Sequence, residues 1–209
     1  MCYKTAFPVT TRLCMTTPTI LVIYAHPAPH RSPVHRRLAE AARELPGVEV
    51  RDLYEAYPDF DIDADHERAL LASAHLLVFL HPFRWYGMPS LVKEWMEVVL
   101  QPGWAYNDGN HAGECALRGK AFWLVTTTGS GPEAYGPGGL HGRPFADFLA
   151  PYEATAALCG MDWIAPLVMH GAAQAAPDAV DAQVAEFRRR LEGYAGLARA
   201  ATEEHVRGA

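Results

Sequence analysis

Five short apolar runs alternate along this chain with segments whose apolar residues recur at helical spacing. The runs cover Thr19–Ala25, Val48–Tyr54, Leu76–His81, Ala121–Thr127 and Trp163–His170. The helical patterns begin near Ser32, Asp63, Pro89, Pro144 and Pro177. Strand and helix in alternation predict an α/β fold with a parallel sheet, because parallel strands need crossover connections that helices usually provide.

The third run indicates how the sheet is covered. Leu76 to Leu80 are all apolar, which is typical of a strand that helices bury on both faces. We therefore predict a flavodoxin-like, three-layer α/β/α sandwich with a five-stranded parallel sheet in the order 2-1-3-4-5. Pro166 interrupts the fifth run. A proline is tolerated at a sheet edge, where this order puts the fifth strand.

The composition is that of an ordinary globular protein without a basic surface. Half of the 209 residues are apolar, a fifth are charged, and the net charge is −6. This balance fits one sizeable core and argues against a nucleic-acid partner. The densest basic spot, Arg188 to Arg190, is either a solvated helix face or a contact for an acidic partner or a membrane.

We divide the chain into an N-terminal extension, residues 1–18, and a single domain, residues 19–209. The extension has no continuous apolar centre, so no secretory signal is predicted. The apolar runs are about seven residues long, whereas a membrane span needs roughly twenty. The four cysteines, Cys2, Cys14, Cys115 and Cys159, form no C-x-x-C pair, and we expect a reducing, cytoplasmic environment.

Three loops are expected to meet at one edge of this sheet. In an open parallel sheet, ligands bind beyond the carboxyl ends of the strands, near the point where the strand order reverses. The loops that follow the first, third and fourth strands are His26–His35, His81–Gly87 and Thr127–His141.

Each loop carries groups suited to a flat heterocycle with a phosphate tail. Ser32 is placed to cap a helix and Pro33 to take its first position, and free N–H groups at a helix N-terminus bind anions. Trp85 and Tyr86 offer planar apolar walls. Gly129 lets backbone N–H groups approach a ligand closely. Together the loops predict a site for a phosphate-bearing cofactor.

The motifs in these loops resemble those of the NAD(P)H:quinone oxidoreductase family of flavodoxin-like flavoproteins. The resemblance is greatest to the ancillary oxidoreductase subunits of glutathione-regulated potassium-efflux systems, and it extends over about residues 19–195. The matching blocks are Tyr24-Ala25-His26-Pro27, Ser32 to His35, His81 to Pro89, Leu91-Val92-Lys93, Gly103-Trp104-Ala105-Tyr106, Thr127-Thr128-Gly129-Ser130 and Cys159-Gly160-Met161.

The resemblance implies a bound flavin. FMN is expected over FAD, the alternative, because nothing obvious in this short chain provides an adenosine pocket. The residues implied to hold the phosphate and ribityl end are His26, Ser32, Pro33, Val34 and His35. Those implied to contact the isoalloxazine are Phe83, Arg84, Trp85, Tyr86, Thr127, Thr128, Gly129 and Ser130. Three of these depart from the usual pattern: Arg84 replaces Gln, His35 replaces Asn and Ser130 replaces Gly.

The same resemblance implies a reaction. NAD(P)H reduces the flavin and leaves, and a quinone then takes the hydride in a ping-pong sequence. Tyr135 and His141 stand at the spacings of the family residues that stabilise negative charge on the reduced flavin. A homodimer with the flavin site at the subunit boundary is also implied. Trp104 and Tyr106 would line the substrate pocket, from this chain or its partner, although Trp104 could equally belong to the core.

Other functions remain open at this point. One is a regulatory ancillary subunit of a membrane potassium-efflux antiporter, held at the inner face of the membrane, with secondary catalysis. Another is an azoreductase or nitroreductase with the same flavin chemistry. No metal site is expected, because the histidines show no H-E-x-x-H or similar ligand spacing. Gly129-Ser130-Gly131 lacks the G-x-S-x-G form of a serine hydrolase.

Overall fold

A computed structural model describes residues 20–107, 109 and 115–208 of the chain, with the side chains of the last helix described up to residue 196. Its strands form one parallel sheet in the order β2-β1-β3-β4-β5, which confirms the predicted flavodoxin-like topology. The strands are β1 (Ile20–Tyr24), β2 (Val48–Asp52), β3 (Leu76–Pro82), β4 (Ala121–Thr127) and β5 (Asp162–Met169).

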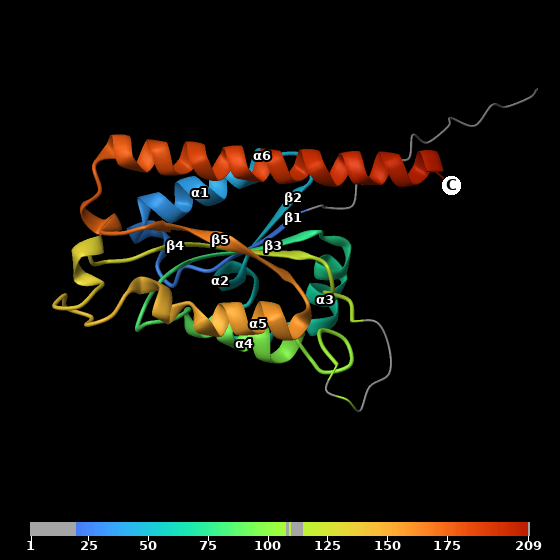
Figure 1. The fold of residues 1–209 in the computed structure, drawn as a ribbon, viewed down its shortest axis with the longest axis horizontal. Helices are drawn as coiled ribbons and strands as arrows, with labels where there is room; N and C mark the ends of the chain where they lie inside the picture. The colour runs from blue at the N-terminus through green and yellow to red at the C-terminus, as the bar shows by residue number, and fades with distance from the viewer. Residues whose placement is uncertain (1–19, 108, 110–114, 209) are drawn as a thin grey trace, which may run out of the picture.

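Helices cover both faces of the sheet in three layers (Figure 1). One face is covered by α1 (Pro33–Arg43) and α6 (Pro177–Gly208). The other is covered by α2 (Leu53–Ala56), α3 (Ala64–Ser73), α4 (Ser90–Val99) and α5 (Ala150–Cys159). Alternate residues of β3 supply the two cores: Leu77 and Phe79 pack under α4, whereas Val78 packs under α1 and α6. This double burial explains why the run is apolar throughout.

The helix starts follow local sequence chemistry. Ser32 caps α1, its Oγ accepting from the His35 N–H at 3.4 Å, and Pro33 takes the first helical position. Asp63 caps α3, its Oδ1 accepting from the His66 N–H at 3.0 Å. These caps satisfy N–H groups that a helix leaves free. The expected starts near Ser32, Asp63, Pro89 and Pro177 are thereby confirmed.

The helical segment expected near Pro144 begins there, but as a short 3₁₀ turn and not as an α-helix. Residues Phe145–Phe148 form a separate 3₁₀ turn, η3, and α5 begins only at Ala150. Pro151 explains the break, because it has no N–H to donate to the carbonyl four residues earlier. The second strand also ends sooner than expected, because Asp52 caps the short helix α2 by accepting from the Glu55 N–H.

Pro166 lies in an edge strand, as the predicted order requires. The pairing of β4 with β5 is irregular there: Trp123 pairs with Ile164 but Val125 pairs with Leu167. Proline has no N–H to donate to the neighbouring strand, and the bulge lets the pairing continue on either side of it.

Several expectations concern regions at the ends or surface of the chain. The N-terminal extension, residues 1–18, lies outside the described residues. No helix among the described residues is long and apolar enough to cross a membrane.

Arg188 pairs with Glu44 and Glu192, while Arg189 and Arg190 both pair with Glu186. The basic run is therefore balanced by carboxylates of α1 and α6. Cys115 and Cys159 are buried free thiols.

Candidate functional site

Two hollows lie beyond the carboxyl ends of the strands, and they share Phe83 and Gly129 in their walls. The larger, about 380 Å³, lies against the start of α1 and is called the anion hollow here. The smaller, about 220 Å³, is lined by aromatic and imidazole rings and is called the ring hollow. Side by side, they provide space for a ligand with one charged end and one flat end.

Two arginines, Arg31 and Arg84, line the anion hollow, and no carboxylate residue lines it. Among the described residues neither arginine has a carboxylate partner within ion-pair distance. Ser32 and Val34 stand there at the N-terminus of α1, whose dipole and Val34 N–H add to the positive field. In a chain of net charge −6, this hollow is suited to an anion such as a phosphate.

The histidines behind the hollow are neutral. His26 and His35 pack with ring centroids 5.1 Å apart, and burial lowers their pKa values to about 4 and about 3. The Ala28 N–H donates to Nδ1 of His26 at 3.0 Å. Because a neutral imidazole carries one proton, Nε2 of His26 is a donor. His35 does not line the hollow, but its Nδ1 lies 2.9 Å from the Oγ of Ser32, which does.

Trp85 and Tyr86 form the rim of the ring hollow on a strained turn. Arg84 and Gly87 exchange both backbone hydrogen bonds, at 3.0 and 3.1 Å. The two residues between them have positive φ angles, 50° for Trp85 and 65° for Tyr86. Side chains other than glycine rarely adopt this conformation, and such strain concentrates at functional sites. The Trp85 side chain is 95% exposed, so burial in this chain does not stabilise it.

Tyr135 and His141 lie together at the base of the ring hollow. Their ring centroids are 4.5 Å apart, and Tyr86 meets His141 edge to face at 5.6 Å. Nε2 of His141 lies 3.1 Å from Ser130 Oγ, while its Nδ1 is buried without a hydrogen-bond partner. Burial raises the pKa of the Tyr135 phenol, which keeps its proton available for donation. An unpartnered nitrogen beside a phenol donor suits a ligand with polar ring atoms.

The structure brings together most of the residues predicted for the site. The anion hollow is lined by His26, Ser32, Pro33, Val34, Phe83, Arg84, Thr127, Thr128 and Gly129. The ring hollow adds Trp85, Tyr86, Ser130, Tyr135 and His141. Of the predicted cofactor residues, only His35 lines neither. Arg84, Thr127 and Thr128, which the resemblance implies as isoalloxazine contacts, line the anion hollow and not the ring hollow. The two hollows together suit a phosphate-bearing cofactor with a flat ring system.

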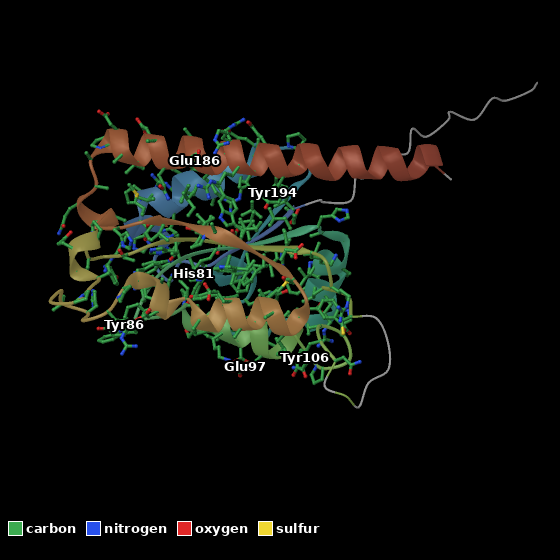
Figure 2. The ribbon with its side chains drawn as sticks, in the orientation of Figure 1. His81, Tyr86, Glu97, Tyr106, Glu186 and Tyr194 are labelled. Atoms are coloured by element: carbon green, nitrogen blue, oxygen red, sulfur yellow. The ribbon has the colours of Figure 1, made fainter. Side chains whose placement is uncertain are left out.

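Trp104 and Tyr106 do not line either hollow of this chain. They pack beside the core under α4, and the Arg68 guanidinium lies 5.8 Å from the Trp104 ring. Tyr106 borders a different hollow, between α4 and α5. Figure 2 shows Tyr86 and Tyr106 well apart from one another. The expectation that they line the substrate pocket is therefore not met within one chain, and a contribution from a partner chain stays a prediction.

The sequence interpretation missed a fourth loop, which follows β5. Ala172 and Ala173 line the anion hollow, and His170 lies against Tyr135 with ring centroids 5.1 Å apart. Arg31 was missed as well, although it precedes Ser32 directly. The available signal was the rule that post-strand loops gather at one edge. The loops after the first, third and fourth strands were predicted from this rule, and the loop after the fifth strand follows from it equally.

Comparisons with known proteins agree with this fold. The family model described as flavodoxin-like fold matches residues 18–194. The glutathione-regulated potassium-efflux system ancillary protein KefF of Klebsiella aerogenes is 44% identical over 172 residues, covering 82% of this chain and 94% of that protein.

Two solved structures are similar over nearly their whole length. The general stress protein 14 of Treponema denticola, in complex with FMN, has a TM-score of 0.78 and 31% identity, covering 85% of this chain and 99% of that one. An NADPH-quinone reductase from P. pentosaceus has a TM-score of 0.72 and 26% identity, covering 82% and 96%.

Proposed function

This chain belongs to the flavodoxin-like fold family, and on that basis we propose that it is an FMN-dependent NAD(P)H:quinone oxidoreductase. The observation that carries the proposal is the pair of adjoining hollows at the carboxyl edge of the sheet. One is cationic without carboxylates, and the other is walled by rings. This is the division of chemistry that a flavin mononucleotide needs.

The phosphate end is assigned to the anion hollow. Arg31 and Arg84 supply charge, Ser32 supplies a hydroxyl, and Val34 supplies an N–H at the first turn of α1. Hydrogen bonds between ionised partners are roughly twice as strong as neutral ones, so these groups would hold a phosphate firmly. The neutral Nε2–H of His26 adds a donor that costs no charge repulsion with the arginines.

The ring end is assigned to the ring hollow. A bound flavin would accept a hydride from NAD(P)H and pass it to a quinone, one partner after the other. The residues of this chain bind and orient these partners. Tyr135 would donate a hydrogen bond, and half-buried His141, whose Nδ1 has no partner, would stabilise developing negative charge beside it. Aromatic Tyr86 and Trp85 form the walls for the flat rings.

FMN is proposed over FAD on the shape of the site. The Arg31 and Arg84 end is where the phosphate would lie, and the hollow there has only about 380 Å³. General stress protein 14, one of the similar structures, was solved with FMN. A quinone is the proposed acceptor, and NADPH or NADH the proposed donor.

A homodimer is proposed as well, with the site at the subunit boundary. Large apolar side chains at the rim of the ring hollow are exposed: Trp85 at 95% and Tyr86 at 53%, with Leu140 at 83% in the loop that carries His141. Exposed apolar side chains clustered around a hollow are typical of an interaction site. Tyr106 and Trp104 are the proposed contributions of the partner.

A second candidate function is favoured by the KefF relative, whose name makes it an ancillary protein of a potassium-efflux system. In that function the chain binds a membrane efflux protein and regulates it, with catalysis secondary. Potassium flux from vesicles that hold an efflux protein distinguishes the two. Flux that still depends on this chain when its turnover is abolished favours regulation, whereas flux that depends on turnover favours the enzyme.

The flavin assignment is tested by titrating flavin-free protein with FMN and with riboflavin, followed by flavin fluorescence. FMN is expected to bind more tightly, and its affinity to fall as salt rises, because charge attracts its phosphate. Equal affinities for the two flavins would contradict the assigned anion hollow.

A further inference from the structure

The loop that follows β5 is bonded to the loop that follows β4. The Gly171 N–H donates to the Ser130 carbonyl at 2.8 Å and the Ala172 N–H to the Thr128 carbonyl at 3.0 Å. Gly171 has a φ of 65°, a left-handed conformation that glycine adopts without strain. The turn at Gly171 therefore fixes His170, the residue before it, against the wall of the ring hollow.

Hydrogen bonds at Thr128 determine which proton His170 carries. Thr128 Oγ1 lies 2.7 Å from the Ser130 carbonyl, which only accepts, so the single hydroxyl proton of Thr128 goes there. Nδ1 of His170 lies 2.9 Å from the same Oγ1. With the hydroxyl proton already used, Nδ1 must be the donor. A neutral imidazole carries one proton, so Nε2 of His170 is bare.

Tyr135 is thus enclosed by two imidazoles. His141 lies on one side, with ring centroids 4.5 Å apart, and His170 lies 5.1 Å away at an angle of 44°. Phe145 closes the cluster, edge to face with His170 at 5.1 Å and with Tyr135 at 5.2 Å. Side chains held on several sides keep one rotamer, which catalytic geometry requires.

We propose that His170 is a positioning residue for Tyr135. Its Nδ1–H, donated to Thr128 Oγ1, and its ring, packed on the phenol, hold the Tyr135 hydroxyl in place beside His141. The inference rests on the proposed function only for its effect on turnover, because the contacts themselves exist without a ligand.

Four variants separate the hydrogen bond from the packing. His170→Phe keeps a ring and removes the donor, whereas His170→Asn keeps a donor near the position of Nδ1 without the ring. Thr128→Val removes the shared hydroxyl, and Thr128→Ser retains it. Circular dichroism spectra that match the wild type identify the variants that keep the fold.

The first readout uses flavin-free protein. Nitrogen-15 spectra of the histidine side chains are expected to show His170 protonated at Nδ1 and bare at Nε2 at neutral pH. Carbon-13 signals of the Tyr135 ring are expected to shift in His170→Phe and in Thr128→Val, but to stay near the wild-type position in Thr128→Ser. The proposal would be overturned by a proton on Nε2 of His170, or by Tyr135 signals that stay at the wild-type position in His170→Phe.

The second readout is the rate at which NADPH reduces the flavin in loaded protein. His170→Phe is expected to lower that rate about three- to ten-fold, the value of one hydrogen bond, with flavin affinity unchanged. His170→Asn is expected to recover part of the loss. Adding Thr128→Val to His170→Phe is expected to cost little more, since both remove one contact. Fully additive losses would refute the shared role.

The spectra and the reduction rate test the role of His170 and the catalytic role of Tyr135 separately. If Tyr135→Phe reduces flavin at the wild-type rate, the proposed catalytic role of Tyr135 fails. The proton on Nδ1 and the Tyr135 signals would still decide whether His170 positions that phenol.

Discussion

The rings of Tyr135 and His141 stack at a centroid distance of 4.5 Å, tilted by 30°, with Ser130 Oγ 3.1 Å from the imidazole Nε2. The phenol and the imidazole come from one loop, six residues apart. They therefore form one unit at the base of the ring hollow.

Replacing either member of this pair should slow flavin reduction without releasing the flavin. Removing a donor aimed at developing charge costs about 2.7–4 kcal/mol, or roughly 10²–10³ in rate. Tyr135→Phe and His141→Gln should show this loss in stopped-flow experiments, with FMN affinity near that of the wild type. Unchanged reduction rates in both variants would remove the pair from the mechanism.

Arg31 should discriminate FMN from riboflavin. It lines the anion hollow, and no carboxylate among the described residues pairs with it. Arg31→Gln should weaken FMN about tenfold, the value of a hydrogen bond to a charged group, and leave riboflavin almost unchanged. Arg36→Gln is the matched control, because Arg36 pairs with Glu40 outside the hollow. Equal losses for both flavins would show that Arg31 does not meet the phosphate.

The strained turn should limit stability. Trp85 has a φ of 50° and a side chain that is 95% exposed, so replacing it relieves strain and removes little burial. Asparagine tolerates the left-handed region, where other residues pay roughly 1–2 kcal/mol. Trp85→Asn should raise the free energy of unfolding of flavin-free protein by about 1 kcal/mol in urea titrations. Trp85→Phe, which keeps the strain, should not, and a Trp85→Asn protein no more stable than Trp85→Phe would argue against a strained turn.

Three buried histidines should make stability pH-dependent. Burial lowers the pKa of His26 and of His81 to about 4, and that of His35 to about 3. The unfolded chain, with an ordinary histidine pKa near 6.5, binds protons that the folded chain does not. Stability is thus complete above pH 6.5 and falls as pH drops toward 4, by about 1.4 kcal/mol per pH unit for each histidine.

Urea titrations at pH 7 and pH 5 measure this slope. His35→Asn should reduce the pH dependence of the free energy of unfolding by the contribution of one histidine. A free energy of unfolding that stays level between pH 6.5 and pH 5 would mean that these rings accept protons in the folded protein.

Glu67 should matter for the fold and not for the site. It is fully buried, its Oε1 accepting from Tyr57 Oη at 2.8 Å and from Arg51 Nε at 3.0 Å, and its Oε2 from Trp95 Nε1 at 3.0 Å. Removing one partner of a buried ion pair costs about 3–5 kcal/mol. Glu67→Ala should lose that much in thermal or urea unfolding. Glu97→Ala, which breaks the exposed pair with Lys93, should lose less than about 1 kcal/mol. Similar losses in both variants would contradict the role of burial.

The sheet could be predicted from sequence because its signals are local. The apolar run at Leu76 fixes a doubly covered strand, and Pro166 marks an edge. The start of α5 could not be placed, because Pro144 and Pro151 are both acceptable in a first helical turn. Only the packing of the 3₁₀ turn between these two prolines determines where α5 begins.

The site was predictable where its residues come directly after a strand. Thr128 was found in this way, and Ser32 was found as the cap of a helix start. His170 also follows a strand directly, but its role depends on a hydrogen bond to Thr128 across two loops, which the sequence does not show. The position of Tyr106 was equally hidden, because a family motif carries no information on which chain completes the pocket. Such relationships are tertiary, and hydrophobic periodicity does not report them.

The absorption spectrum of protein loaded with FMN, recorded without oxygen before and after NADPH, tests the proposed function most directly. The flavin band near ~450 nm should bleach with NADPH and return when a quinone is added. Protein that retains FMN but is reduced by neither NADPH nor NADH, or that retains no flavin at all, would contradict the proposed oxidoreductase.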